Sequence, residues 1–276
     1  MKVKTINKFV VEPVKIPKIN IPIKGSEIVG TSYPYSSNFL IARTKSGKTN
    51  AIYNIIKAIT DKDVNIIIFC PSFYSDTVWI EIKKMIEKQG NNYVVFESMY
   101  DENKHNILKD LIKDLYKHEE PEEVKKEDET ILNFDLFKSE RKKERKKKEK
   151  KKKYFVPEHL IILDDISANT RDAAVAQLLK VHRHLHATVL LSSQAPLDLK
   201  PDSLSQLTNI MIFKGFLDNI QKLEKLHEAL NLSVNFEDFR NMYEMAINYA
   251  PYSFFYVNRD GDYRINFNKQ FLMDEE

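Results

Sequence analysis

The chain has 276 residues, of which 42% are hydrophobic and 30% are charged, values that fit a globular protein carrying one highly charged segment. Its single cysteine, Cys70, excludes an intramolecular disulfide, and no apolar run approaches the roughly 20 residues that a membrane-spanning helix needs. The formal net charge of +3 is set mainly by one basic tract, so it says little about the folded part.

Residues 1–36 contain prolines between short apolar stretches, at positions 13, 17, 22 and 34. Prolines at this density exclude a helix and favour extended backbone. The segment is either an extended arm, laid along the core or reaching a neighbouring subunit, or a partly ordered tail. It lacks an apolar core followed by a small-residue cleavage site, so it is not typical of a secretory signal and we expect an intracellular protein.

From Ser37 onward, short apolar runs alternate with segments of helical periodicity. Continuous apolar runs of this length are typical of strands that are buried on both faces. The predicted strands are Ser37–Ala42, Val64–Cys70, Tyr93–Glu97, Leu160–Asp164, Ala187–Ser192 and Asn209–Phe213. The predicted helices are Lys48–Thr60, Asp76–Gln89, Asn103–His118, Arg171–Leu185, Asn219–Leu230 and Phe236–Ile247. This alternation predicts an α/β fold with a mostly parallel sheet and helices on both faces.

The alternation fails between His118 and Tyr154. Residues 119–153 comprise an acidic stretch, a short apolar patch and a basic tract, Lys138–Lys153, with 12 basic and 3 acidic residues. Such a segment repels itself and cannot bury enough apolar surface to order itself, so we predict a disordered surface insertion. Long surface insertions cost little closure entropy.

Near the C-terminus, Ser253–Val257 and Tyr263–Phe267 flank a turn that contains Asp260 and Gly261, which is a hairpin signal. We expect this antiparallel pair to extend the sheet. The chain is therefore divided into the arm at 1–36 and one domain at 37–276, interrupted by the insertion at about 119–153.

The segment between the first predicted strand and the first predicted helix, ARTKSGKT, follows the phosphate-binding pattern G-x-x-x-x-G-K-[ST]. Gly47 lets the backbone approach a phosphate, and the N–H groups at the helix N-terminus attract an anion. Lys48 is predicted to reach the β- and γ-phosphates, and Thr49 to ligate Mg²⁺. The predicted ATP-binding residues are Ala42, Arg43, Thr44, Lys45, Ser46, Gly47, Lys48, Thr49 and Asn50.

Ala42 stands where the pattern has its first glycine. A positive φ at this position would cost alanine about 1–2 kcal/mol, whereas an ordinary negative φ would cost nothing. The backbone at Ala42 thus bears on whether the loop is functional or degenerate.

Two further predicted strands end in polar residues. LIILDD ends in Asp164 and Asp165, and we predict that Asp164 holds the metal ion and that Asp165 activates the attacking water. Aspartate is shorter than the glutamate found in many ATPases, so that water must sit closer or another group must help. VLLSSQ ends in Gln194, whose amide would face the same crevice and orient water or report on the γ-phosphate. The alternatives are a loop-capping pair of acids and a strand that simply enters a turn.

Together with these motifs, RHLHATVLLSSQAP, residues 183–196, resembles the FtsK/HerA class of DNA-pumping ATPases. That class carries an arginine and then a strand ending in glutamine 11 residues later, the spacing of Arg183 and Gln194. The Asp-Asp ending, the Arg-His pair and the aromatic C-terminal hairpin are similar to its viral branch, the genome-packaging ATPases of poxviruses, other large DNA viruses and virophages. The resemblance covers about Ser37–Phe267 without the insertion.

The resemblance implies a RecA-like core that forms a ring of five or six subunits around double-stranded DNA, with ATP bound between subunits. Arg183 would then be an arginine finger for the neighbour's γ-phosphate, worth about 10³-fold or more in rate. Arg171 and Arg43 are weaker candidates, and Arg183 could instead be a solvated helix residue. The implied partners are DNA and a capsid or portal-vertex protein, in a viral factory of the host cytoplasm or in the virion.

Other residues have simpler interpretations. His182 and His186 would share a helix face, but no cysteine or acid lies at ligand spacing, so we do not expect them to bind a metal. Trp79 is predicted to be a core residue and Cys70 to pack at a strand end. The basic tract could bind DNA phosphates, remain a solvated loop or bind acidic surfaces of the virion.

Three functions therefore remain open. The first is an ATP-driven motor that packages double-stranded DNA. The second is a P-loop nucleotide kinase, although the chain lacks an arginine-rich lid and an apparent second nucleotide site. The third is a nucleotide- or DNA-binding assembly protein, which would follow if Ala42 and Asp165 abolish turnover.

Overall fold

The computed structural model describes residues 21–26, 35–117, 154–166 and 169–272. The predicted insertion at 119–153 lies outside these residues, as does most of the predicted arm at 1–36. Within the described part of the chain, no helix has the length and hydrophobicity needed to cross a membrane.

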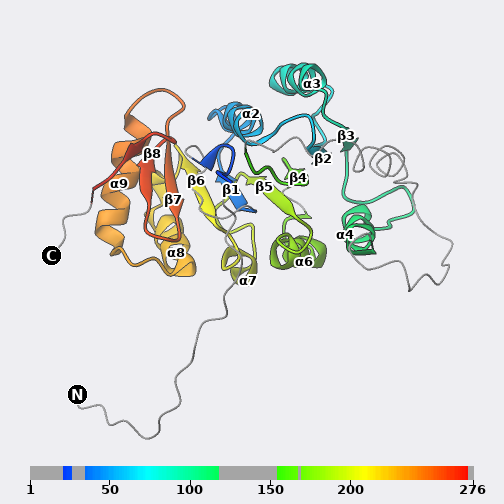
Figure 1. Cartoon of the computed structure of the whole chain (residues 1–276). Helices are drawn as coiled ribbons and strands as arrows, with labels where there is room; N and C mark the ends of the chain where they lie inside the picture. The colour runs from blue at the N-terminus through cyan, green and yellow to red at the C-terminus, as the bar shows by residue number, and fades with distance from the viewer. Residues whose placement is uncertain (1–20, 27–34, 118–153, 167–168, 273–276) are drawn as a thin grey trace, which may run out of the picture.

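The described strands form one sheet in the order β3-β2-β4-β5-β1-β6-β7-β8-β9 (Figure 1). Neighbouring strands from β3 to β6 are parallel, and β7, β8 and β9 continue the sheet in antiparallel fashion. The bounds are β1 Ser37–Ile41, β2 Asn65–Phe69, β3 Tyr93–Phe96, β4 His159–Leu163, β5 Ala187–Ser193, β6 Asn209–Phe213, β7 Phe254–Asn258, β8 Tyr263–Ile265 and β9 Lys269–Gln270. This confirms the predicted fold class: a mostly parallel sheet with a C-terminal antiparallel hairpin.

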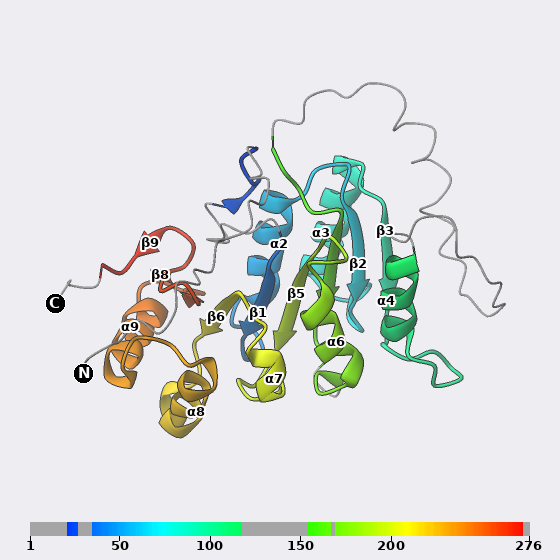
Figure 2. The ribbon, with the colours of Figure 1, turned by 60° about the horizontal axis from the view of Figure 1, so that its bottom comes forward.

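Helices cover both faces of the sheet. Figure 1 shows α2 and α3 on one face and α4, α6, α7 and α8 on the other. The bounds are α2 Lys48–Ile59, α3 Thr77–Gln89, α4 Ile107–Lys117, α6 Ala173–Val181, α7 Pro201–Leu204, η3 Leu217–Asn219, α8 Ile220–Leu230 and α9 Phe236–Asn248. Seen from the second direction, β3 and α4 lie at one end of the sheet and β8, β9 and α9 at the other (Figure 2).

The central strands are buried on both faces because successive side chains alternate between two cores. In β1, Phe39 and Ile41 pack in the core that includes α4, α6, α8 and α9, while Leu40 packs in the core that includes α2 and α3. β4 divides in the same way, with Ile161 and Ile162 in different cores. The continuous apolar runs of the sequence reflect this double burial.

The order of the central strands positions the candidate site. β5 lies between β1 and β4 and runs parallel to both, with Ile41 opposite Ser193 and Leu163 opposite Leu191. The segments that follow these three strands therefore leave the sheet at the same edge, which we call the carboxyl edge. The segments that precede them lie at the opposite, amino edge.

Two predicted helices were longer than the observed ones. The predicted helix Arg171–Leu185 is α6, which ends at Val181, so His182 and His186 do not share a helix face. His186 has a left-handed φ of 47°, and the N–H of Ala187 donates to the carbonyl of His182 at 2.9 Å, so the chain turns there into β5. The predicted helix Asn103–His118 begins only at Ile107, after Asn106, whose Oδ1 accepts from the N–H of Lys109 at 2.9 Å.

Candidate functional site

Between β1 and α2 the chain forms a tight loop. Lys45 and Gly47 have left-handed φ values of 63° and 97°, and both the N–H and the hydroxyl of Ser46 donate to the carbonyl of Arg43 at 3.2 and 2.6 Å. Ala42 is not among the described residues with positive φ. Its side chain is buried, and its N–H donates to the carbonyl of Ser193 at 2.9 Å. The missing first glycine therefore introduces no backbone strain at Ala42.

The loop leads directly into the amino end of α2. Gly47 is the N-cap, no side chain caps the helix, and its first turn contains no acidic residue. The N–H groups at such a helix end attract anions, and here the helix presents no carboxylate of its own to compete with one. Thr49 is half-buried and Asn50 exposed in this first turn. The predicted ATP-binding residues are thus contiguous around the start of α2.

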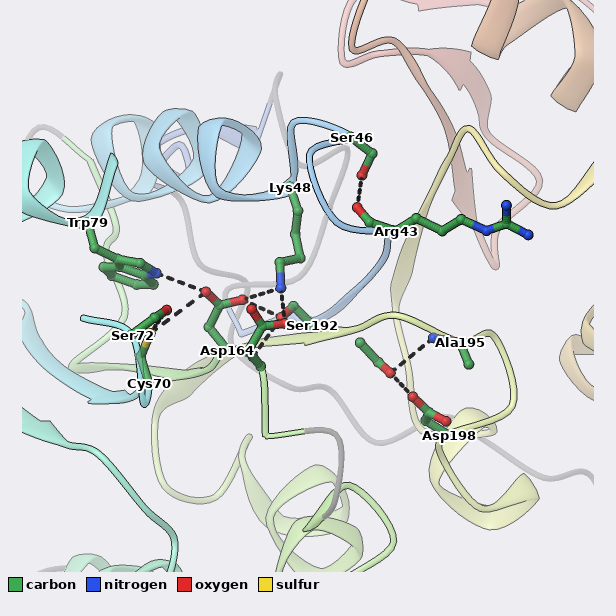
Figure 3. A network of polar contacts seen from close by, with 12 residues as sticks. Arg43, Ser46, Lys48, Cys70, Ser72, Trp79, Asp164, Ser192, Ala195 and Asp198 are labelled. Carbon is green, nitrogen blue, oxygen red and sulfur yellow. Dashed lines mark hydrogen bonds and ion pairs between the residues drawn. The ribbon is translucent and has the colours of Figure 1, made fainter. Parts of the chain in front are cut away.

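Lys48 forms ion pairs with both predicted acids, and Figure 3 shows its ammonium group beside Asp164. Its Nζ lies 3.0 Å from Asp164 Oδ1 and also donates to Asp165 Oδ1. Lys48 is 8% exposed and Asp164 is 1% exposed. Burial by itself lowers the pKa of Lys48, but the neighbouring carboxylates of Asp164 and Asp165 outweigh it and leave that pKa raised. Lys48 is therefore a cation at neutral pH, and the acids converge on it.

Asp164 is oriented by donors from two other elements. Trp79, on α3, donates its indole N–H to Asp164 Oδ2 at 2.8 Å, and the Ser192 hydroxyl, on β5, donates to Oδ1. Trp79 is fully buried, as predicted, but its hydrogen bond to the acid was not anticipated from the sequence. Its helical spacing signals a core position and says nothing about where the N–H points. The hydrogen bond from Ser192 to Asp164 was likewise not predicted from the sequence.

Cys70 lies beside this acid, at the end of β2. Its Sγ is 3.9 Å from Asp164 Oδ2. Burial, and secondarily the negative charge of Asp164, raises the pKa of Cys70 to about 12. A thiol with this pKa stays protonated at neutral pH and is a poor nucleophile. The sequence-based interpretation of Cys70 as a packed strand-end residue agrees with this environment.

Asp165 is the more accessible of the two acids, with 39% of its side chain exposed. It has a left-handed φ of 54°, a conformation that aspartate tolerates better than most residues. Its N–H lies 3.3 Å from the Ser192 hydroxyl. This turn buries one acid and leaves the next one open to solvent, while both remain paired with Lys48.

Gln194 follows β5 directly and is exposed at the same carboxyl edge. The loop that follows Gln194 is held by hydrogen bonds from β5 and from Arg171. Asp198 accepts from the hydroxyl of Ser193, and Arg171 donates to the carbonyls of Leu197 and Asp198 at 3.0 and 3.3 Å. Arg171 is thus engaged in holding this loop.

Arg183 and Arg43 lie away from the cluster. Arg183 is exposed in the turn before β5, at the amino edge, so the seven residues of β5, or about 23 Å, separate it from Gln194. Figure 3 shows the Arg43 side chain extending away from Lys48. Its guanidinium carbon lies 5.8 Å from the centre of the Phe216 ring. The fold therefore brings Lys48, Asp164 and Asp165 into contact and places Gln194 at the same edge of the sheet, whereas Arg183 lies at the other edge.

The donor set at the carboxyl edge suits Mg²⁺. In the described ranges no three or more histidine, cysteine, aspartate or glutamate side chains are grouped as a metal cage. Mg²⁺ does not need such a cage, because it keeps several waters and binds through one or two carboxylates and substrate phosphates. Asp164 and Asp165 already converge on a cation, the ammonium group of Lys48. Asp164, with the Thr49 hydroxyl, could hold the metal ion, and the more exposed Asp165 would remain open to water.

No protein-family model and no curated protein matches this chain. Among solved structures, it is similar to the genome packaging NTPase B204 from Sulfolobus turreted icosahedral virus 2 in complex with AMP, with a TM-score of 0.50 and 17% identity over 87% of this chain and 100% of that one. The cytoplasmic domain of the Thermomonospora curvata Type VII secretion ATPase EccC matches with a TM-score of 0.49 and 13% identity, over 87% of this chain and 26% of that one. The first likeness shows a fold shared with a genome-packaging NTPase.

Proposed function

We propose that this chain is an ATP-driven motor that moves double-stranded DNA into a viral capsid. One observation carries the proposal: the fold brings the loop lysine, two acids and a strand-end glutamine to one edge of the sheet, although up to 146 positions separate them in the 276-residue sequence. The fold shared with a genome-packaging NTPase supports the same function.

Each residue has a defined part in this proposal. The N–H groups at the start of α2 and the Lys48 ammonium would bind the phosphates of ATP, and Lys48 would balance the charge that develops on them. Asp164 and Thr49 would hold Mg²⁺, which supplies charge neutralisation at the phosphates. Asp165, exposed beside the buried acid, would orient water and accept its proton, while the Gln194 amide helps to position that water. Because Lys48 already pairs with both acids, its ammonium must exchange partners when phosphates bind.

Arg183 fits the proposal only if a second subunit supplies it. It is exposed at the amino edge, about 23 Å along β5 from the site of its own chain. In a ring of five or six subunits, the amino edge of one copy would face the carboxyl edge of the next. Arg183 would then contact the neighbour's γ-phosphate and couple cleavage to assembly. The DNA would pass through the ring, and the motor would act at a capsid or portal vertex in the viral factory.

The test is the steady-state ATPase rate with and without duplex DNA, with particle mass measured in parallel. We expect DNA to stimulate the parent protein, and Lys48→Ala to lower the rate about 100-fold or more. Lys57→Ala is the matched control, because Lys57 is an exposed lysine on the same helix. Equal rates for Lys48→Ala and the parent would overturn the enzymatic proposal. An ATPase rate that duplex DNA does not change would overturn the proposal of a DNA motor. ATP binding without hydrolysis would favour an assembly protein.

A further inference from the structure

One exposed aromatic side chain lies directly against the phosphate-binding loop. Tyr252 is 67% exposed and lies in the turn between α9 and β7, and it has a left-handed φ of 65°. A Cβ placed on Gly47 would come within 2.9 Å of Tyr252 Cβ and 3.2 Å of Tyr252 Cδ1. The absence of a side chain at Gly47 thus lets the tyrosine approach the loop backbone. A bulky residue with positive φ is strained, and such strain is concentrated at functional sites.

The sheet order sets which end of a bound nucleotide would meet Tyr252. The acids follow β4, which lies beyond β5 on one side of β1. Tyr252 leads into β7, which lies beyond β6 on the other side of β1. If the γ-phosphate lies near the acids, the nucleoside must extend past the loop in the opposite direction. Tyr252 lies on that side.

We infer that Tyr252 is the platform on which the base of the nucleotide stacks. This inference rests on the proposed ATP-binding function of the loop. An exposed tyrosine ring offers an apolar face and a polar tip, which suits a planar base that remains partly in water. Tyr74 is comparably exposed, at 61%, but it follows β2, on the acid side of β1, and is therefore at the wrong end for the base.

Calorimetric titration with Mg²⁺-ATP and with Mg²⁺-tripolyphosphate separates the base from the phosphates. Tyr252→Ala should weaken ATP binding about 10-fold through the lost stacking, and it should leave tripolyphosphate binding unchanged. Tyr252→Phe keeps the ring and should bind ATP like the parent. Tyr249→Ala is the matched control, because Tyr249 is also exposed, at 50%, and precedes the same turn.

The outcomes are separable. A parent protein that binds neither ATP nor tripolyphosphate would overturn the proposed function and this inference with it. Equal ATP affinity in the parent protein and in Tyr252→Ala would overturn this inference and leave the proposed function standing. An equal loss for both ligands would also overturn it, because Tyr252 would then act by shaping the loop through Gly47. If Tyr252→Ala changed the particle mass but not the ATP affinity, the inference would also be overturned, because the tyrosine side chain would then lie at a contact between subunits.

Discussion

Two buried polar clusters lie at opposite edges of the same sheet, and they are built from different chemistry. The carboxyl edge holds ions, with Lys48 paired to Asp164 and Asp165. The amino edge holds neutral groups centred on Asn209. The amide of Asn209 donates to Asn38 Oδ1 at 2.8 Å and accepts from Tyr256 OH at 2.7 Å and Asn258 Nδ2 at 2.8 Å.

The neutral groups hydrogen-bond to one another through Asn209 and tie β1, β6 and β7 together in register. Burial raises the pKa of Tyr256, so its hydroxyl remains a donor at neutral pH. The ionic cluster is harder to explain by stability, because desolvating a charge pair costs about as much as its attraction returns. Buried charges are concentrated at functional sites. Under the proposed function, the amino edge therefore serves folding and the carboxyl edge serves chemistry.

Asn209→Ala should produce the largest effect on stability. The substitution leaves the buried partner groups of Asn38, Tyr256 and Asn258 without their shared amide, which should lower the free energy of unfolding by about 3 kcal/mol. Denaturant unfolding measures this, with the exposed Asn248→Ala as the matched control. The ATPase rate well below the melting temperature should stay unchanged. A lower rate at unchanged stability would break the division between the two edges.

His182 should give the amino edge a sensitivity to acid. Burial, and less strongly the nearby charge of Arg183, lowers the pKa of His182 to about 4, while a hydrogen bond with the Leu179 carbonyl opposes the shift. The unfolded chain takes up the proton near its ordinary pKa of about 6.5. The contribution of His182 to stability is thus fully present above pH ~6.5 and is lost as the pH falls toward 4. At pH 5 this loss lowers the free energy of unfolding by about 2 kcal/mol.

Unfolding free energies at pH 7 and pH 5 test this prediction. His182→Gln should reduce the loss of stability between the two pH values, because it removes the buried titrating group. His184→Gln is the matched control, since His184 is an exposed histidine in the same turn. Identical pH dependence in His182→Gln and the parent protein would show that the amino edge tolerates a charge at this position.

The sequence was sufficient to predict the sheet, its covering helices and the carboxyl-edge arrangement of Lys48, Asp164 and Asp165. These predictions rest on local signals: apolar runs, helical periodicity and a loop motif of fixed spacing. The backbone at Ala42 could not be predicted, because strain at that position depends on φ. The structure places positive φ at Lys45 and Gly47.

Side-chain contacts between residues far apart in the chain could not be predicted from the sequence either. Trp79 and Asp164 are 85 residues apart, and the indole N–H meets the carboxylate only because α3 packs beside the ends of β2 and β4. The early end of α6 at Val181 was missed for a related reason. The segment that follows continues the helical pattern, but the left-handed backbone of His186 redirects the chain into β5.

Trp79→Phe should give the smallest effect and tests how the ionic cluster depends on the surrounding core. Phenylalanine keeps most of the buried ring but removes the N–H that holds Asp164 Oδ2. Because groups that orient a metal-binding carboxylate tune its affinity, the Mg²⁺ concentration for half-maximal ATPase activity should rise about 10-fold. The rate at saturating Mg²⁺ should fall less, since Lys48 and Asp165 remain in place.

Phe73→Leu is the matched control for this measurement. The Phe73 ring lies 5.3 Å from Trp79 and contributes packing to the same core without a bond to Asp164. If both variants lower stability and only Trp79→Phe changes the Mg²⁺ dependence, the indole N–H positions the acid. If both shift the Mg²⁺ dependence equally, general loosening of the core is sufficient, and Asp164 is held mainly by Lys48 and Ser192. The carboxyl edge would then be organised by its own charges rather than by a donor from α3.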